Sequence, residues 1–212
     1  MRGVFITLEG VEGGGKSTQI GLLARHFEDQ GRVVMVTREP GGTTIGEAIR
    51  GVLLDPDFRG MTSLAEAFLY EAARAQHVAE RIGPAIESGS IVLCDRFVDS
   101  TVAYQCAGRA LDRETIVRLN ALAVGGAWPD LTIVLDVPVA EGLERAKGVG
   151  APDRLEQESV AFHERVRAEF RRLAEEEPGR VKVVDAGRAI DAVFAEVRAH
   201  ADVVLAARGG GP

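Results

Sequence analysis

Residues 10 to 17 read Gly10-Val11-Glu12-Gly13-Gly14-Gly15-Lys16-Ser17 and, with Thr18 after them, match the phosphate-binding pattern G-x-x-x-x-G-K-[ST]. The apolar run Val4-Phe5-Ile6-Thr7-Leu8 comes directly before this stretch, and a helical pattern begins at Gln19 directly after it. A strand, a glycine-rich loop and a helix in this order direct backbone N–H groups at a phosphate, at the positive end of the helix. The stretch therefore predicts a nucleotide-binding P-loop.

The P-loop pattern also assigns chemistry to its members. Lys16 would reach the β- and γ-phosphates of ATP, and the Ser17 hydroxyl would be a ligand of the accompanying Mg²⁺. The sequence thus predicts ATP and Mg²⁺ as cofactors. The residues expected to bind them are Gly10, Val11, Glu12, Gly13, Gly14, Gly15, Lys16, Ser17 and Thr18.

The composition is that of an ordinary globular protein. The 212 residues are 46% hydrophobic and 27% charged, and the net charge of −7 argues against nucleic acid or an anionic membrane as the main partner. No apolar run approaches the ~20 residues of a membrane helix, and the chain enters a strand at once, so a cytoplasmic location is expected. Cys94 and Cys106 lack metal-ligand spacing and are expected to be free thiols.

Apolar runs alternate with helical patterns along the chain. After residues 4 to 8, strands are expected at 33 to 36, 91 to 94, 131 to 135 and 181 to 184. Helices are expected at about 17 to 30, 44 to 54, 62 to 88, 99 to 107, 112 to 125, from 139, 154 to 177 and 188 to 207. This predicts an α/β fold, a P-loop NTPase-type three-layer sandwich with a five-stranded parallel sheet flanked by helices. A single domain is expected over residues 1 to 208, with a disordered tail at 209 to 212.

Charged residues follow the predicted strands at the rim where the carboxyl ends of parallel strands gather. Asp95 ends the third strand, where a P-loop protein needs a carboxylate to orient Mg²⁺ opposite Ser17, although it could instead cap the next helix. Arg96 and Arg38 lie on the same rim with no obvious acidic partner other than Glu39, and a guanidinium suits bidentate phosphate contacts. These arginines indicate a second phosphorylated ligand beside ATP.

Further polar side chains recur at helical spacing near this rim. Tyr70 and Arg74 are one turn apart, and they could form a simple cation–π pair or could stack on a base and read its edge. Four polar residues also follow Arg96 within ten positions, which is unusual for a turn that only packs a core. They are Ser100, Thr101, Tyr104 and Gln105.

These motifs together carry a family resemblance. They are Arg38-Glu39-Pro40-Gly41-Gly42-Thr43, then Asp95-Arg96-Phe97-Val98-Asp99-Ser100-Thr101-Val102-Ala103-Tyr104-Gln105, then Asp153-Arg154-Leu155-Glu156. With these motifs in this order after the P-loop, the chain resembles bacterial thymidylate kinase from Phe5 to about Val197. The resemblance implies transfer of the ATP γ-phosphoryl group to dTMP, giving dTDP, by a homodimer whose substrates are dTMP and ATP.

The resemblance also implies which residues hold dTMP. Arg96 and Arg38 would bind its phosphate, Arg74 would hydrogen-bond the thymine on which Tyr70 stacks, and Tyr104 would lie under the sugar where a 2′-hydroxyl would otherwise fit. The implied substrate-binding residues are Arg38, Pro40, Tyr70, Arg74, Arg96, Ser100, Thr101, Tyr104 and Gln105.

Catalytic cations are expected from a lid at about residues 145 to 156. The P-loop offers no arginine, so the chain resembles the kind of thymidylate kinase whose lid supplies arginines to the ATP phosphates. Arg145, Lys147 and Arg154 flank a flexible stretch at 148 to 152, whereas Val149 stands where that kind often has arginine. The residues expected to be catalytic are Lys16, Asp95, Arg96, Arg145 and Arg154.

Two other functions are open at this point. Another small kinase of the same class would act on a different nucleotide or on a deoxynucleoside. A P-loop switch or regulatory NTPase would need a guanine-reading N-K-x-D element or a water-positioning glutamine near the loop, and we find neither in the sequence.

Overall fold

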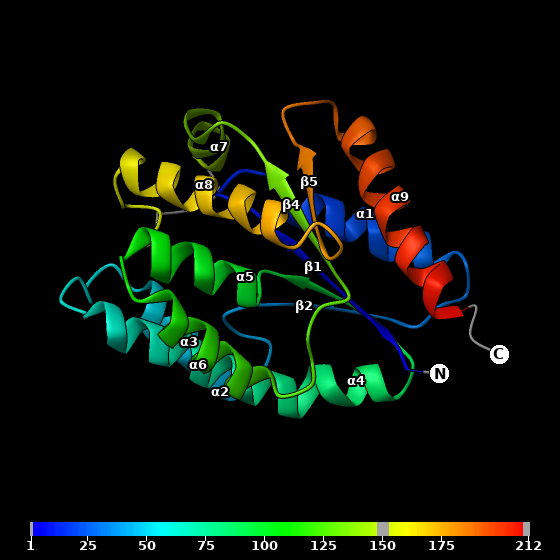
Figure 1. Cartoon of the computed structure of the whole chain (residues 1–212), viewed down its shortest axis with the longest axis horizontal. Helices are drawn as coiled ribbons and strands as arrows, with labels where there is room; N and C mark the ends of the chain where they lie inside the picture. Colours follow the sequence, from blue (N-terminus) through cyan, green and yellow to red (C-terminus); the bar gives the residue numbers. More distant parts are fainter. Residues whose placement is uncertain (1, 148–152, 210–212) are drawn as a thin grey trace.

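The computed structural model describes residues 2–147 and 153–209, and within them a parallel sheet lies between layers of helices (Figure 1). The strands are β1 (Val4–Glu9), β2 (Val34–Arg38), β3 (Ile91–Asp95), β4 (Leu131–Asp136) and β5 (Val181–Asp185). Their order across this sheet is β2-β3-β1-β4-β5, with every neighbouring pair parallel. The predicted five-stranded sheet is confirmed.

The two strands beside the P-loop form the most deeply buried part of the sheet. Every residue of β1 and β4 is buried, which accounts for their nearly continuous apolar sequences. The two threonines of these strands pair with each other, since the Thr7 and Thr132 hydroxyl oxygens are 2.8 Å apart. The buried strand β1 therefore holds the start of the P-loop in one position.

Helices cover both faces of the sheet. The helices α1 (Lys16–Glu28) and α9 (Ile190–Gly209) pack on one face, and α4 (Gly83–Glu87) and α8 (Val160–Glu176) contact strands on the other (Figure 1). The remaining helical segments are α2 (Thr44–Leu54), α3 (Ser63–His77), η1 (Val78–Ile82), α5 (Val98–Thr101), η2 (Val102–Gly108), α6 (Arg113–Val124) and α7 (Val139–Ala146).

The helix expected over residues 62 to 88 is interrupted by the π-helical segment η1. The Gly83 N–H donates to the Val78 carbonyl five residues back. Pro84 follows at the start of α4, and its ring lacks an N–H and crowds the carbonyl of Glu80, so the regular α-helical pattern cannot continue there.

The helix expected from residue 154 starts only at Val160. The Ser159 side chain accepts a hydrogen bond from the Phe162 N–H and so caps α8. Before that cap, the Asp153 carboxylate accepts bonds from the Leu155 and Glu156 N–H groups and folds this segment into a turn. A turn closed by the Asp153 side chain therefore stands where the first turn of the helix was expected.

Two stretches singled out in the sequence fall partly or wholly outside the described residues. Residues 148–152, which include the expected flexible stretch and Val149, and residues 210–212 of the expected tail lie outside the described residues. In the described part of the chain, no helix is both long enough and apolar enough to cross a membrane.

Candidate active site

The P-loop curls around its own lysine. Gly10, Gly13 and Gly15 have φ angles of 125°, 69° and 84°, which residues with a side chain rarely adopt. Lys16 Nζ donates to the carbonyls of Gly10 and Val11 at 3.1 and 3.0 Å, and burial lowers the pKa of its ammonium group to about 8. The loop is thus preformed, with its cation held at the centre.

Two oxygen-bearing side chains meet beside this lysine. Ser17 Oγ, in the first turn of α1, donates to Asp95 Oδ2 at the end of β3 over 3.3 Å. A hydroxyl and a carboxylate are hard donors of the kind Mg²⁺ accepts, and this ion is usually completed by phosphates and waters. The described residues contain no group of three His, Cys, Asp or Glu side chains suited to enclose a metal. The pair therefore fits an ion brought in with a nucleotide.

A cavity opens over the P-loop, and we call it the P-loop cavity. Its walls include Glu12, Gly13, Gly15, Lys16, Ser17, Thr18, Arg38, Asp95, Arg96 and Arg145. The rim loops of β1, β2 and β3 therefore meet as the parallel topology requires.

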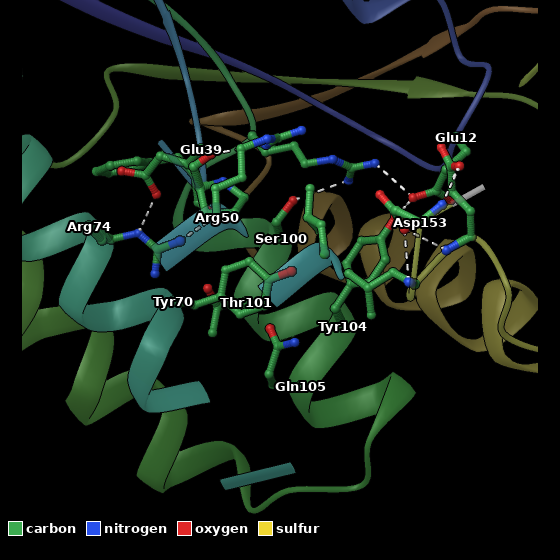
Figure 2. Close-up of a pocket in the computed structure, with 16 residues that line it drawn as sticks. Glu12, Glu39, Arg50, Tyr70, Arg74, Ser100, Thr101, Tyr104, Gln105 and Asp153 are labelled. Carbon is green, nitrogen blue, oxygen red and sulfur yellow. Dashed lines mark hydrogen bonds and ion pairs between the residues drawn. The ribbon is translucent and has the colours of Figure 1, made fainter. Parts of the chain in front are cut away.

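A second cavity adjoins the first (Figure 2). Its walls include Pro40, Tyr70, Arg74, Arg96, Ser100, Thr101, Tyr104 and Gln105. All the expected substrate-binding residues except Arg38 are in this set. Arg38 lines the P-loop cavity instead, and it is about half exposed.

Arg38 has an acidic partner besides Glu39, one that was not obvious from the sequence. Arg38 Nη2 donates to both carboxylate oxygens of Glu47, at 3.0 and 2.8 Å. Helix α2 brings Glu47 back to the end of β2, where it also accepts from the Gly42 N–H. Glu47 thereby ties together the two ends of the loop that runs from Arg38 to Gly42.

Arg74 is fully buried and lies at one end of the second cavity (Figure 2). Its Nε donates to Glu39 at 2.8 Å, and its Nη1 donates to Glu71 and Asn120 at 2.6 and 2.8 Å. Nη2 donates to the Phe97 carbonyl at 3.1 Å. A guanidinium has five N–H groups, so within the described residues one Nη2 N–H is left for a ligand.

Arg96 also has an acidic partner that the sequence did not suggest. Its Nη2 lies 3.0 Å from Glu12 Oε1 in the P-loop, and its guanidinium lies over the Tyr104 ring at 5.0 Å. The Tyr104 hydroxyl donates to the same Glu12 oxygen at 2.7 Å. Burial alone would raise the pKa of the Glu12 carboxyl, but contact with His163 and the charges of Arg96 and Lys16 bring it well below its ordinary value.

The expectation that Arg154 reaches the ATP phosphates from a lid is not met in this structure. Its Nη1 lies 2.5 Å from Glu66 Oε2, its Nε donates to the Leu53 carbonyl, and its side chain is only 8% exposed. It lines neither cavity described above. Arg145 does line the P-loop cavity, where it donates to the Ala186 carbonyl and pairs with Glu141.

The structure adds residues that we did not single out in the sequence. Arg50 lines both cavities and donates to the Pro40 carbonyl at 2.9 Å. Glu9 accepts bonds from the Phe97 N–H and the Ser100 hydroxyl at 2.7 and 2.5 Å. Burial and the nearby carboxylate of Asp99 raise the pKa of Glu9 to about 8. The sequence could have pointed to Glu9, because it is the one charged residue of the mostly apolar strand β1.

The fold and the two cavities define a P-loop kinase, in which a nucleotide on the P-loop faces a second ligand held by arginines and aromatic side chains. A family model described as thymidylate kinase matches residues 8–197. This chain belongs to the thymidylate kinase family.

Individual relatives agree with this assignment. The thymidylate kinase of Halothermothrix orenii is 52% identical over 200 residues, covering 93% of this chain and 95% of its own. That of Geobacter sulfurreducens is 52% identical over 209 residues, covering 96% and 97%. The crystal structure of thymidylate kinase from Ehrlichia chaffeensis is similar with a TM-score of 0.77 and 34% identity, covering 95% of this chain and 99% of that one.

Proposed function

We propose that this chain transfers the γ-phosphoryl group of ATP to the 5′-phosphate of dTMP, giving ADP and dTDP. The wall shared by the two cavities carries the proposal, because Glu12, Arg50 and Arg96 line both of them. A nucleotide in each cavity would meet its neighbour at these side chains. The two reacting phosphates would then lie between Arg50, Arg96 and Lys16.

Alignment and charge neutralisation are the main tasks of such an enzyme. Phosphoryl transfer has a loose transition state whose charge spreads over the equatorial oxygens. Lys16 would neutralise charge on the donor while Arg96 and Arg50 hold the acceptor phosphate in line. That acceptor is already ionised, so the reaction needs no strong general base.

Ser17 and Asp95 are the residues that would hold Mg²⁺. When bound there, the ion would neutralise charge on the β- and γ-phosphates of ATP. Arg145 is the candidate for a further cation on the donor side, because it lines the P-loop cavity from α7.

The second cavity suits a pyrimidine base. The Thr101 hydroxyl is buried without a hydrogen-bond partner among the described residues, and Arg74 has a spare N–H. Gln105 adds an amide, although its Nε2 already donates to Glu66. These groups can bond a base edge while the half-buried Tyr70 ring packs on its face.

An assay of acceptors tests the proposal. ADP release would be followed with ATP, Mg²⁺ and dTMP, dUMP, dCMP, AMP or GMP, and with thymidine as an unphosphorylated acceptor. We expect turnover to be fastest with dTMP and to disappear in Lys16→Ala. A preference for a purine monophosphate or a nucleoside would refute the assignment, and ADP release independent of any acceptor would indicate a regulatory NTPase.

We also propose that the enzyme is a homodimer that works in the cytoplasm, where its substrates occur. Helices α2, α3 and α6 pack side by side (Figure 1), and large apolar side chains on them are exposed. Examples are Ile45, Phe68 and Leu122, which are 53%, 53% and 82% exposed. Exposed apolar groups on adjacent helices favour burial against a second copy. Light scattering should give twice the chain mass, and Phe68→Glu should shift it to the monomer.

A further inference from the structure

His163 of α8 is a buried histidine with a single polar neighbour among the described residues. Its side chain has no exposed surface, and Nδ1 lies 3.2 Å from Glu12 Oε2. Within the described residues neither ring nitrogen nor Glu12 Oε2 has a partner at hydrogen-bond geometry, so the 3.2 Å approach of Nδ1 to Oε2 is the polar contact that each of these groups has. Since an unpartnered polar group in the interior is costly, the Glu12 carboxylate is the natural hydrogen-bond acceptor for the His163 ring, and a small rotation of either side chain would complete the bond.

The tautomer of His163 follows from this geometry. A carboxylate oxygen accepts hydrogen bonds and donates none, so the ring nitrogen that faces it at 3.2 Å is assigned the proton. His163 therefore presents Nδ1–H to Glu12. The buried His163 ring of α8 therefore faces Glu12 of the P-loop.

Glu12 joins the two cavities. Its other oxygen, Oε1, holds Arg96 at 3.0 Å and the Tyr104 hydroxyl at 2.7 Å. Glu12 lies at the end of the second cavity opposite Arg74 (Figure 2). Rotation of this one carboxylate would free the tyrosine hydroxyl and Arg96 Nη2, while Arg96 Nη1 would keep its bonds to the Gly10 carbonyl and the Ser100 hydroxyl.

Helix α8 supports the same cluster through apolar contacts. Phe162 and Phe170 pack edge-on against the Tyr104 ring, with centroids 6.0 and 6.3 Å away. These contacts fix the ring position but do not touch the second carboxylate oxygen of Glu12. Arg96 and Tyr104 hold Oε1, and His163 is the polar group that faces Oε2.

We propose that His163 is a positioning residue for phosphoryl transfer: its Nδ1–H fixes the Glu12 carboxylate, and through it Arg96 and Tyr104, against the acceptor. This role rests on the proposed function. It predicts that loss of the Nδ1–H impairs use of dTMP more than use of ATP, because Tyr104 lines only the second cavity, while Glu12 and Arg96 lie where the two cavities meet.

Steady-state kinetics of position-163 variants test this role. His163→Phe keeps an aromatic ring without a donor, and we expect kcat/KM for dTMP to fall about 10- to 100-fold with KM for ATP changed less than about 2-fold. His163→Asn places an amide N–H near the lost Nδ1–H and should recover most of the activity. His163→Gln places its amide one atom further out and should not.

A double-mutant cycle separates positioning from a general effect on packing. If His163 acts through Glu12, His163→Phe should cost much less in the Glu12→Gln background than in the unmodified enzyme. Additive losses, or equal kinetics in the Phe and Asn variants, would overturn the proposal. So would a variant with a lower melting temperature and unchanged kcat/KM for dTMP. Failure of the unmodified enzyme to phosphorylate dTMP would refute the proposed function itself, and this role with it.

Discussion

Ser17 Oγ donates a hydrogen bond to Asp95 Oδ2, and this contact joins the start of α1 to the end of β3 across 78 positions of sequence. It is short enough for one small ion to contact both side chains. The rest of the P-loop cavity is arranged around this pair, with Lys16 in the adjacent position of the same helix.

Asp95→Asn should slow turnover about 100-fold and raise the Mg²⁺ concentration needed for half-maximal rate, because an amide is a weaker ligand than a carboxylate. ADP release measured across a Mg²⁺ series checks both effects. Asp57→Asn, at an exposed loop position, is the control and should match the unmodified enzyme. An unchanged Mg²⁺ dependence in Asp95→Asn would remove this carboxylate from the metal site.

Arg154→Ala should affect stability rather than catalysis. The substitution removes one arginine from a buried Glu66 carboxylate, and we expect unfolding to become easier by about 3 kcal/mol, with Arg109 still paired to Glu66. Urea unfolding gives this value, and turnover at a temperature where the variant is folded should change only a few-fold. Arg118→Ala breaks an exposed pair and should be nearly neutral. If turnover instead slowed about 100-fold with stability intact, Arg154 would be restored as a catalytic arginine.

Gly142→Ala should disturb ATP binding through backbone contact between α7 and the P-loop. A Cβ on Gly142 would lie 2.4 Å from the Glu12 carbonyl oxygen, so the helix that carries Arg145 must move away. We expect KM for ATP to rise several-fold, with KM for dTMP affected less. Gly21→Ala, on the helix surface where a Cβ meets nothing, is the matched control and should gain up to about 1 kcal/mol of stability. Equal kinetics in the two variants would contradict the prediction.

The pH dependence of stability should carry a contribution from Glu9. Burial and Asp99 raise its folded-state pKa from 4.5 to about 8, so folding retains a proton that the unfolded chain releases. The stabilising contribution is complete below pH 4.5 and is lost as pH rises toward 8, at about 1.4 kcal/mol per pH unit. Glu9→Gln removes the titration, and its amide can accept from the Phe97 N–H and donate to the Ser100 hydroxyl oxygen. Its unfolding free energy should therefore fall less over this range than that of the unmodified protein, and parallel curves from urea unfolding would count against this assignment.

Local patterns in the sequence were enough to predict most of the fold. The apolar runs of β1 and β4 are buried on both faces, and such strands are recognised by their composition alone. Errors arose where one side chain redirected the backbone. Asp153 folded the expected first turn of α8 into a tight turn, and Pro84 interrupted the long helix.

The sequence was a weaker guide to what each site residue contacts. Arg38 and Arg154 both stand in motifs, and the motifs suggested phosphate contacts for both. The structure pairs them with Glu47 and Glu66, which α2 and α3 bring from elsewhere in the chain. An arginine bonds whichever carboxylate the packing presents, so its partner cannot be deduced from its own neighbourhood.

Nucleotide binding through residues 10 to 17 could be predicted from the order of amino acids alone, because a P-loop depends on local glycine conformations and on the helix that follows directly. Which arginines line the two cavities and which carboxylates they pair with became clear only from the packed structure. Arg38 meets Glu47 across 9 positions of sequence, and Arg96 meets Glu12 across 84. Contacts of this kind form only after the sheet and its helices have packed, so no stretch of the chain specifies them by itself.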